Sequence, residues 1–160
     1  QVIIMTIRRA ESRDIPGMIE LLYQVGSVHH DIRPDIFRSG ALKYTPEQLE
    51  ELLQDGNKPI FLCETNGFVA GYCFCVLKTF RDHETFTDRT EFYIDDLCVD
   101  ENHRKQGIAT ALFERAVDYA KECRYDAITL NVWCGNDSAM KFYEKAGLKP
   151  RNILMEMKLC

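Results

Sequence analysis

The sequence has 160 residues, of which 46% are hydrophobic and 28% are charged. A chain of this length and composition forms one globular domain with a substantial core and leaves little room for a second. The formal net charge of −5 argues against binding to nucleic acid or to an anionic membrane surface. The longest strongly apolar run, residues 68–77, covers about half of the ~20 residues that a membrane-spanning helix needs.

The seven cysteines form no Cys-x-x-Cys pair, so we expect buried, reduced thiols and a cytoplasmic protein. A metal site built from Cys73, Cys75 and a histidine is the alternative, but the spacing typical of zinc sites is absent and no metal is expected. No signal peptide is recognised. Met5 resembles a natural start more than Gln1 does, so residues 1–4 are expected to be non-native or an extension.

The first third of the chain predicts one strand followed by two helices. Residues 2–8 are rich in β-branched side chains, which favours a strand. Asp14 is placed to cap a helix that Gly26 can stop. A capping box that starts at Thr45 predicts a second helix, which ends near residues 55–56.

The middle of the chain predicts a hairpin and a further strand. Asn66-Gly67 tolerates the positive φ angles of a type I′ turn, and it separates apolar runs over residues 59–65 and 68–80. Residues 81–90 form a charged loop. The apolar run over residues 91–99 then predicts another strand.

The last third predicts a helix over residues 107–123, a strand over 126–133, a short helix over 136–148 and a closing strand over 152–159. The resulting order is β-α-α-β-β-β-α-β-α-β. This order indicates a single α/β (α+β) domain over residues 1–160. We expect a central mixed, mostly antiparallel sheet of six to seven strands flanked by about four helices.

Residues 104–109, with the sequence RKQGIA, join the strand over 91–99 to the following helix. A helix start offers free backbone N–H groups and the positive end of the helix dipole, which suits phosphate. Gly107 lets a ligand approach the backbone closely, and two basic side chains add positive charge. From these residues alone, a pyrophosphate cradle and a solvated basic turn are equally good interpretations.

Two motifs favour the cradle. Residues 104–109 fit the pattern R/Q-x-x-G-x-G/A, which resembles the acetyl-CoA pyrophosphate loop of the GNAT superfamily of N-acetyltransferases. Residues 136–148, NDSAMKFYEKAGL, resemble the pattern N-x-x-A-x-x-F/Y-Y-x-x-x-G-F of the same family. The order of the elements matches as well. Ala109 stands where glycine is commoner and Leu148 where phenylalanine is commoner, which are small departures.

The resemblance implies acetyl-CoA as co-substrate and a GNAT-like fold. The backbone of residues 97–99 would pair with the pantetheine arm, and the N–H groups of residues 105–110 would hold the pyrophosphate. Asn136 would contact the cofactor arm, although it is also a good helix N-cap, and both roles can hold. The cofactor-binding residues expected from the resemblance are Leu97, Cys98, Val99, Arg104, Lys105, Gln106, Gly107, Ile108, Ala109, Thr110, Asn131, Asn136, Ser138, Phe142 and Tyr143.

The resemblance also suggests an acid and a base for acetyl transfer. Tyr143 matches the family's usual acid position, although it also belongs to an apolar helix stripe and could simply pack in the core. Asp95 matches the first acid of the Y-L-E-D-F-F-V segment of spermidine/spermine acetyltransferases, and Glu91 matches the base of ribosomal-protein acetyltransferases. Asp96 and a water molecule are the alternatives. Strict alternation places Asp95 and Asp96 on opposite faces, with Asp95 on the side of Leu97.

Acceptor specificity in the family comes from segments that correspond to residues 26–44 and 80–90 here. The acidic balance suggests a small cationic amine, with a peptide amine, an amino acid or an aminoglycoside as alternatives. The resemblance implies direct attack of a primary amine on acetyl-CoA in a ternary complex, and a homodimer by default. A catalytically silent CoA-binding or sensing domain, or an interaction domain without cofactor, are the competing interpretations.

Overall fold

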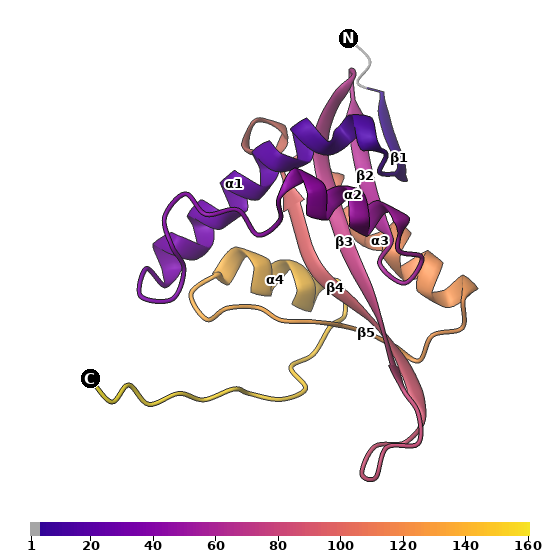
Figure 1. Ribbon diagram of the computed structural model, residues 1–160, viewed down its shortest axis with the longest axis vertical. Coiled ribbons are helices and arrows are strands. Elements are labelled where there is room, and N and C mark those ends of the chain that lie inside the picture. The colour runs from indigo at the N-terminus through magenta and orange to yellow at the C-terminus, as the bar shows by residue number, and fades with distance from the viewer. Residues whose placement is uncertain (1–3) are drawn as a thin grey trace.

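The computed structural model describes residues 4–160 and contains one five-stranded sheet in the order β1-β2-β3-β4-β5. Neighbouring strands are antiparallel except β4 and β5, which are parallel (Figure 1). The strands are β1 Met5–Arg9, β2 Ile60–Thr65, β3 Phe68–Phe80, β4 Arg89–Val99 and β5 Ala127–Leu130. The helices are α1 Ile15–Ile32, α2 Pro46–Gln54, α3 Ile108–Glu122 and α4 Asp137–Lys145, with short 3-10 turns η1 Ser12–Asp14 and η2 Glu101–His103.

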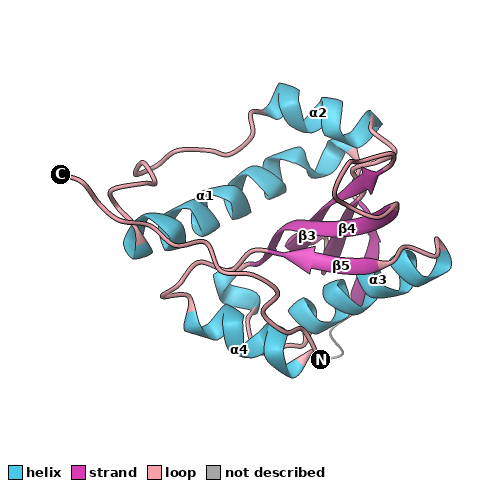
Figure 2. Cartoon of the chain, turned by 90° about the horizontal axis from the view of Figure 1, so that it is seen from below, coloured by secondary structure: helices cyan, strands magenta, loops and turns pink. Residues whose placement is uncertain are grey.

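Helices cover both faces of the sheet, and each face has its own core (Figure 2). The period of two along β3 sends Tyr72 and Phe74 to the α1/α2 side, and Cys73 and Cys75 to the α3 side. The buried core on the α3 side consists of Phe61, Cys63, Ala70, Cys73, Cys75, Phe92, Ile94, Ile108, Leu112, Phe113, Ala116 and Ala120. The core on the α1/α2 side consists of Ile15, Met18, Leu21, Leu22, Leu49, Ile60, Leu62, Tyr72, Phe74 and Cys98.

The Thr45 capping box and the Asn66-Gly67 turn were predicted correctly, whereas Asp14 stands at the N-cap of α1 but makes no side-chain capping hydrogen bond and pairs with Arg8 instead. Thr45 accepts a hydrogen bond from the Gln48 N–H at 3.2 Å, and the Gln48 side chain accepts one from the Thr45 N–H at 2.9 Å. Asn66 and Gly67 have φ angles of 50° and 79°, as a type I′ hairpin turn requires. The first strand begins at Met5, and residues 2–3 of the predicted strand lie outside the described residues.

The prediction that Gly26 stops the first helix is wrong, because α1 continues to Ile32. A Cβ atom at Gly26 would lie 3.1 Å from the backbone oxygen of Ala41. The glycine therefore allows the loop after α1 to pass close to the helix. It serves a close backbone approach inside the helix rather than a helix end.

The C-terminal part of the sheet is smaller than expected. β5 has four residues instead of the eight predicted over residues 126–133, and residues 152–159 form no strand. The sheet within residues 4–160 therefore has five strands rather than six to seven. A strand needs a neighbour to satisfy its backbone, and in this chain the closing segment has none beside it.

All seven cysteines are free, which agrees with the expectation of reduced thiols. The burial of the cysteine side chains was predicted less well. The buried ones are Cys63, Cys73, Cys75 and Cys98, and the exposed ones are Cys123, Cys134 and Cys160. Burial raises the pKa of the Cys98 thiol to about 12, so this thiol is a packing group rather than a nucleophile at neutral pH.

Gly71 places the start of α3 against the sheet. A Cβ atom at this position would lie 2.9 Å from the backbone oxygen of Cys98 and 3.0 Å from side-chain atoms of Ile108 and Leu112. The first turn of α3 therefore reaches the last residues of β4, which is the position where the predicted site residues gather.

Candidate active site

Strands β4 and β5 separate halfway along β4. β5 pairs only with the segment from Glu91 to Ile94, whereas β3 follows β4 as far as Val99. From Asp95 onward, no strand of residues 4–160 lies on the β5 side of β4. The backbone of Leu97, Cys98 and Val99 therefore lies on a free strand edge.

A β-bulge marks the point of separation. Phe74 is opposite Asp96 and Cys75 is opposite Ile94, so Asp95 is the extra residue on β4. The bulge interrupts the alternation of side chains, and the prediction that the two aspartates point to opposite faces is wrong. Asp95 accepts a hydrogen bond from Tyr44 and Asp96 accepts one from Tyr72, each at 2.7 Å, and both tyrosines belong to the α1/α2 side.

The two carboxylates have different environments. Asp95 Oδ2 forms an ion pair with Lys43 Nζ at 2.9 Å. Burial raises the pKa of Asp96 to about 6; the Asp95 charge adds to this, whereas the Tyr72 hydrogen bond and Lys43 oppose it. Asp96 thus titrates close to neutral pH, where a general base works best.

Glu91, the other acid predicted from the sequence, is 4% exposed and bound to arginines. Arg151 Nη1 donates to both carboxylate oxygens at 2.7 and 3.0 Å, and Arg89 Nη2 lies 3.5 Å from Oε2. These contacts occupy the carboxylate with protein cations. The geometry is that of a structural ion pair that ties the segment after α4 to β4.

The loop from Asp100 to Gly107 presents backbone N–H groups. Asp100 accepts hydrogen bonds from Gln24 Nε2 at 2.8 Å and His103 Nδ1 at 2.7 Å, which fixes the start of the loop. Lys105 and Gly107 have φ angles of 62° and 78°. The first intrahelical bond of α3 runs from the Ala111 N–H to the Gly107 oxygen, and no side chain caps this helix start.

The N–H groups of Ile108, Ala109 and Thr110 therefore have no partner within α3. Together with the two left-handed residues before them, they form a turn of backbone N–H groups at the positive end of the helix dipole, a geometry that suits an anion. Arg104, Lys105 and Gln106 surround the turn and are exposed. The residues expected to hold a pyrophosphate thus lie together in one place.

Helix α4 provides the remaining predicted residues. Asn136 is its N-cap and accepts hydrogen bonds from the Ala139 N–H at 3.4 Å and the Ser138 hydroxyl at 3.3 Å, which confirms the capping interpretation. Phe142 and Tyr143 pack against the core on the α3 side. Burial, with smaller contributions from Cys73 and Asp96, raises the pKa of Tyr143, so its phenol stays protonated at neutral pH.

Asn131 lies beyond the end of β5 and donates from Nδ2 to the Tyr93 hydroxyl at 2.9 Å. Lys43 and Tyr44, which hold Asp95, were not singled out from the sequence. They belong to the segment over residues 26–44 that the family resemblance linked to the acceptor. No local pattern marks them, because their role depends on a contact across more than fifty residues.

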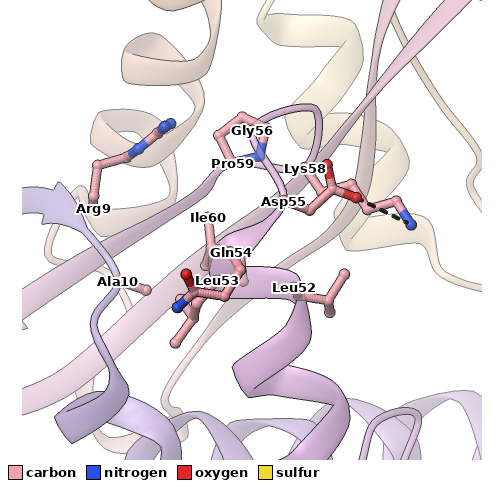
Figure 3. A pocket seen from close by; sticks show the side chains of 10 residues that line it. All are labelled: Arg9, Ala10, Leu52, Leu53, Gln54, Asp55, Gly56, Lys58, Pro59 and Ile60. Carbon is pink, nitrogen blue, oxygen red and sulfur yellow. Dashed lines mark ion pairs between the residues drawn. The ribbon is translucent and has the colours of Figure 1, made fainter.

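A shallow pocket of about 120 Å³ lies elsewhere, between the end of α2 and the start of β2 (Figure 3). Its lining residues are Arg9, Ala10, Leu52, Leu53, Gln54, Asp55, Gly56, Lys58, Pro59 and Ile60. None of the predicted site residues lines it. Within residues 4–160, no three His, Cys, Asp or Glu side chains are grouped to hold a metal ion, and no described helix is long and apolar enough to cross a membrane.

The family model described as "Acetyltransferase (GNAT) family" matches residues 27–148, which is most of the chain. The chain belongs to the GNAT family of acetyltransferases. This membership confirms the resemblance inferred from residues 104–109 and 136–148. The GNAT fold is also confirmed in its single mixed sheet and four helices, with the strand number corrected to five.

Known proteins share the fold along nearly the whole chain. A crystal structure of a mutant BH1408 protein from Bacillus halodurans is 31% identical, has a TM-score of 0.93, and covers 97% of this GNAT chain and 99% of that chain. A protein of Methanocaldococcus jannaschii, named as an uncharacterized N-acetyltransferase, is 26% identical over 149 residues, 93% of this chain and 62% of that protein.

Streptothricin acetyltransferase A of Bacillus subtilis is 38% identical over 52 residues, which are 32% of this chain and 30% of that protein. The chain thus spans less than two thirds of the length of both curated relatives.

Proposed function

We propose that this GNAT chain transfers the acetyl group of acetyl-CoA to a primary amine. One observation carries the proposal: the uncapped start of α3 lies beside the free edge of β4, and the Asp95–Asp96 pair lies on the same strand. The start of α3 fits a pyrophosphate, and the free edge of β4 fits an extended amide-containing arm. The two aspartates fit an amine that has to lose a proton.

On the cofactor side, backbone groups do most of the binding. The N–H groups of residues 105–110 would receive the pyrophosphate, with Arg104 and Lys105 adding charge. The free edge at residues 97–99 would pair with the pantetheine amides in the manner of an added strand. Asn131, Asn136, Ser138 and Phe142 remain predicted contacts of the cofactor arm.

On the acceptor side, the two aspartates divide the work. A primary amine has a pKa of ~10, so roughly one molecule in a thousand is unprotonated at neutral pH. Asp95 already holds an ammonium group, that of Lys43, and an incoming ammonium would compete for the same carboxylate. Asp96, with its pKa of about 6, would then take the proton, directly or through water.

The reaction itself needs no covalent enzyme intermediate. The amine nitrogen attacks the thioester carbonyl, the C–N bond forms, and the C–S bond breaks. The Tyr143 hydroxyl, kept protonated by its partly buried position, would donate a hydrogen bond to the departing thiolate. The thiolate then takes up the second proton, which the nitrogen loses as it becomes an amide. Glu91, bound by Arg151, would support β4 beneath the site rather than act as the base.

Cofactor binding can be tested with a matched pair of glycine variants. Gly107 and Gly67 have nearly equal φ angles of 78° and 79°, and a Cβ atom would meet nothing within 4 Å at either. Gly107→Ala and Gly67→Ala should therefore cost similar stability, about 1 kcal/mol. Calorimetry should show weaker CoA binding, by tenfold or more, in Gly107→Ala alone. Equal CoA affinity in both variants would mean that the start of α3 is not part of the cofactor site.

Turnover should be followed by free-thiol release with spermine, spermidine, lysine, amino acids, an aminoglycoside, short peptides and streptothricin. The last is included because a relative is named for it. We expect Tyr143→Phe to bind CoA normally and to lose about 10²-fold in kcat. Tight CoA binding without turnover on any amine would favour the sensing domain, and no CoA binding would contradict the proposal as a whole.

A further inference from the structure

The loop between α1 and α2 brings a primary amine of the chain itself into the candidate site. Lys43 Nζ lies 2.9 Å from Asp95 Oδ2, and the Tyr44 hydroxyl donates a hydrogen bond to the same oxygen at 2.7 Å. Among the ion pairs of residues 4–160, no other lysine pairs with an acid of the candidate site. Lys43 therefore stands where an acceptor amine is expected to arrive.

The residues beside Lys43 fix its position. Leu42 and Tyr44 both pack against the core on the α1/α2 side, and the Tyr44 ring stacks on Phe74 with ring centroids 5.6 Å apart. The Lys43 side chain itself is 46% exposed. The backbone is thus anchored on both sides of this residue, while the flexible four-carbon stem remains free to turn.

The Lys43 ammonium group is an electrostatic neighbour of the proposed base. Burial raises the pKa of Asp96, and the Lys43 charge opposes this rise. Burial also raises the pKa of Tyr143, the proposed acid, and the Asp96 charge adds to that rise. Amine, base and acid therefore meet where β4 separates from β5, next to the free edge over residues 97–99.

We propose that Lys43 is an acetyl acceptor within its own chain, a proposal that rests on the proposed function. An ammonium nitrogen has no free electron pair, so the Lys43 ammonium group first gives one proton to Asp96, directly or through water. The nitrogen then attacks the thioester carbonyl of acetyl-CoA, the N–C bond forms and the C–S bond breaks. The CoA thiolate takes up the second proton, which the nitrogen loses as it becomes an amide.

Acetylation would change the acceptor side of the site. Acetyl-lysine is neutral, so the ion pair with Asp95 is lost, whereas the hydrogen bond from Tyr44 remains. Asp95 would then accept the ammonium group of an added amine without competition from Lys43.

Peptide mass spectrometry after incubation with trideuterated acetyl-CoA tests the modification. Lys58 is the matched control, because it is 43% exposed, pairs with Asp55 and lines the separate pocket of Figure 3. We expect at least about tenfold more acetyl on Lys43 than on Lys58 at equal times, because only Lys43 is held beside the proposed base. The count includes unlabelled acetyl already present at purification. Equal occupancy of the two lysines would mean acetylation without catalysis and overturns the proposal.

Variants and dilution show how the acetyl group arrives. Lys43→Arg keeps the positive charge but has no amine to acetylate, so it should lose the modification, whereas Lys58→Arg should keep it on Lys43. Tyr143→Phe should slow acetylation of Lys43 about 10²-fold and leave that of Lys58 unchanged. At saturating acetyl-CoA, the rate per chain should stay constant over a hundredfold dilution of the protein. A wild-type rate in Tyr143→Phe, or a rate that rises with protein concentration, overturns the proposal.

A measurement without acetyl-CoA tests the position of Lys43. Lys43→Gln removes the charge that opposes the raised pKa of Asp96, so this pKa should be higher in the variant than in the wild type, and Lys58→Gln should leave it unchanged. Carbon-13 NMR of the aspartate carboxyl groups measures it. An unchanged pKa in Lys43→Gln would mean that Lys43 does not lie at the proposed base, which overturns the proposal.

The outcome for Lys43 can be separated from the outcome for the proposed function. Thiol release with an added amine, but no acetyl on Lys43, would overturn this proposal and leave the proposed function intact. The absence of both reactions would overturn both.

Discussion

Asp96, the proposed base, lowers the stability of the folded protein at neutral pH. Its pKa is raised to about 6 by burial, so the folded protein binds a proton more tightly there than the unfolded chain, whose aspartates titrate near 3.9. The stability that this proton provides is fully present below pH ~4 and is lost as the pH rises through about 6. At neutral pH the ionised carboxylate therefore costs up to about 3 kcal/mol.

We predict that Asp96→Asn is more stable than the wild type at pH 8 and shows a flatter stability profile between pH 4 and 7. Asparagine still accepts the Tyr72 hydrogen bond but has no charge to desolvate. The same variant should lose 10²- to 10⁴-fold in kcat/KM. Thermal unfolding across pH, with turnover, measures both. Asp95→Asn is the control, because it loses the Lys43 ion pair and should not be stabilised. A destabilised Asp96→Asn at pH 8 would contradict the argument.

Asp95 and Asp96 show which features of single residues could be predicted from the sequence and which could not. The adjacent acids in an apolar strand were recognised from the sequence, and so was the basic turn that follows them. The directions of the two aspartate side chains were not predicted, because the bulge depends on how β3 and β4 pair and leaves no local signal in the sequence. Tyr44 and Lys43 were missed for a related reason, since only the folded loop brings them to Asp95.

Among the elements, α3 depends on the close approach that Gly71 permits. We predict that Gly71→Ala lowers stability by about 1–3 kcal/mol, because the new methyl group would press on the backbone oxygen of Cys98. It should also weaken CoA binding by moving the first turn of α3 relative to β4. Gly56→Ala, where a Cβ atom meets nothing within 4 Å, is the control. Thermal unfolding and calorimetry measure the two effects. Unchanged CoA affinity in a destabilised Gly71→Ala would mean that CoA binding does not depend on the position of α3.

Elements with a local cause were predicted from the sequence, and elements that need a distant neighbour were not. The Thr45 capping box and the Asn66-Gly67 turn are complete within four residues, so their patterns sufficed. Residues 152–159 have the alternation of a strand, and their pattern was interpreted as one. Alternation makes a strand possible, but a strand forms only beside a free sheet edge, and none of the five described strands lies beside this segment.

For the whole molecule, the two halves of the fold differ in how completely they are covered. β2 to β4 are packed between α1 and α2 on one side and α3 on the other, and the sheet residues of both buried cores come from these three strands. β5, α4 and residues 149–160 contain no buried residue. Asn131, Asn136 and Tyr143 belong to this second half, so part of the candidate site lies where the molecule is least covered.

Local stability should therefore differ between the two halves of the molecule. Segments with few buried side chains open at a lower free-energy cost than the core strands. We predict that the backbone amides of β5 and α4 exchange with solvent deuterium at least about tenfold faster than those of β2 and the middle of β3, because the latter are buried and β5 and α4 contain no buried residue. Hydrogen exchange followed by mass spectrometry measures the difference. Equal protection of the two sets of amides would mean that β5 and α4 are as stable as the core strands in spite of their exposure.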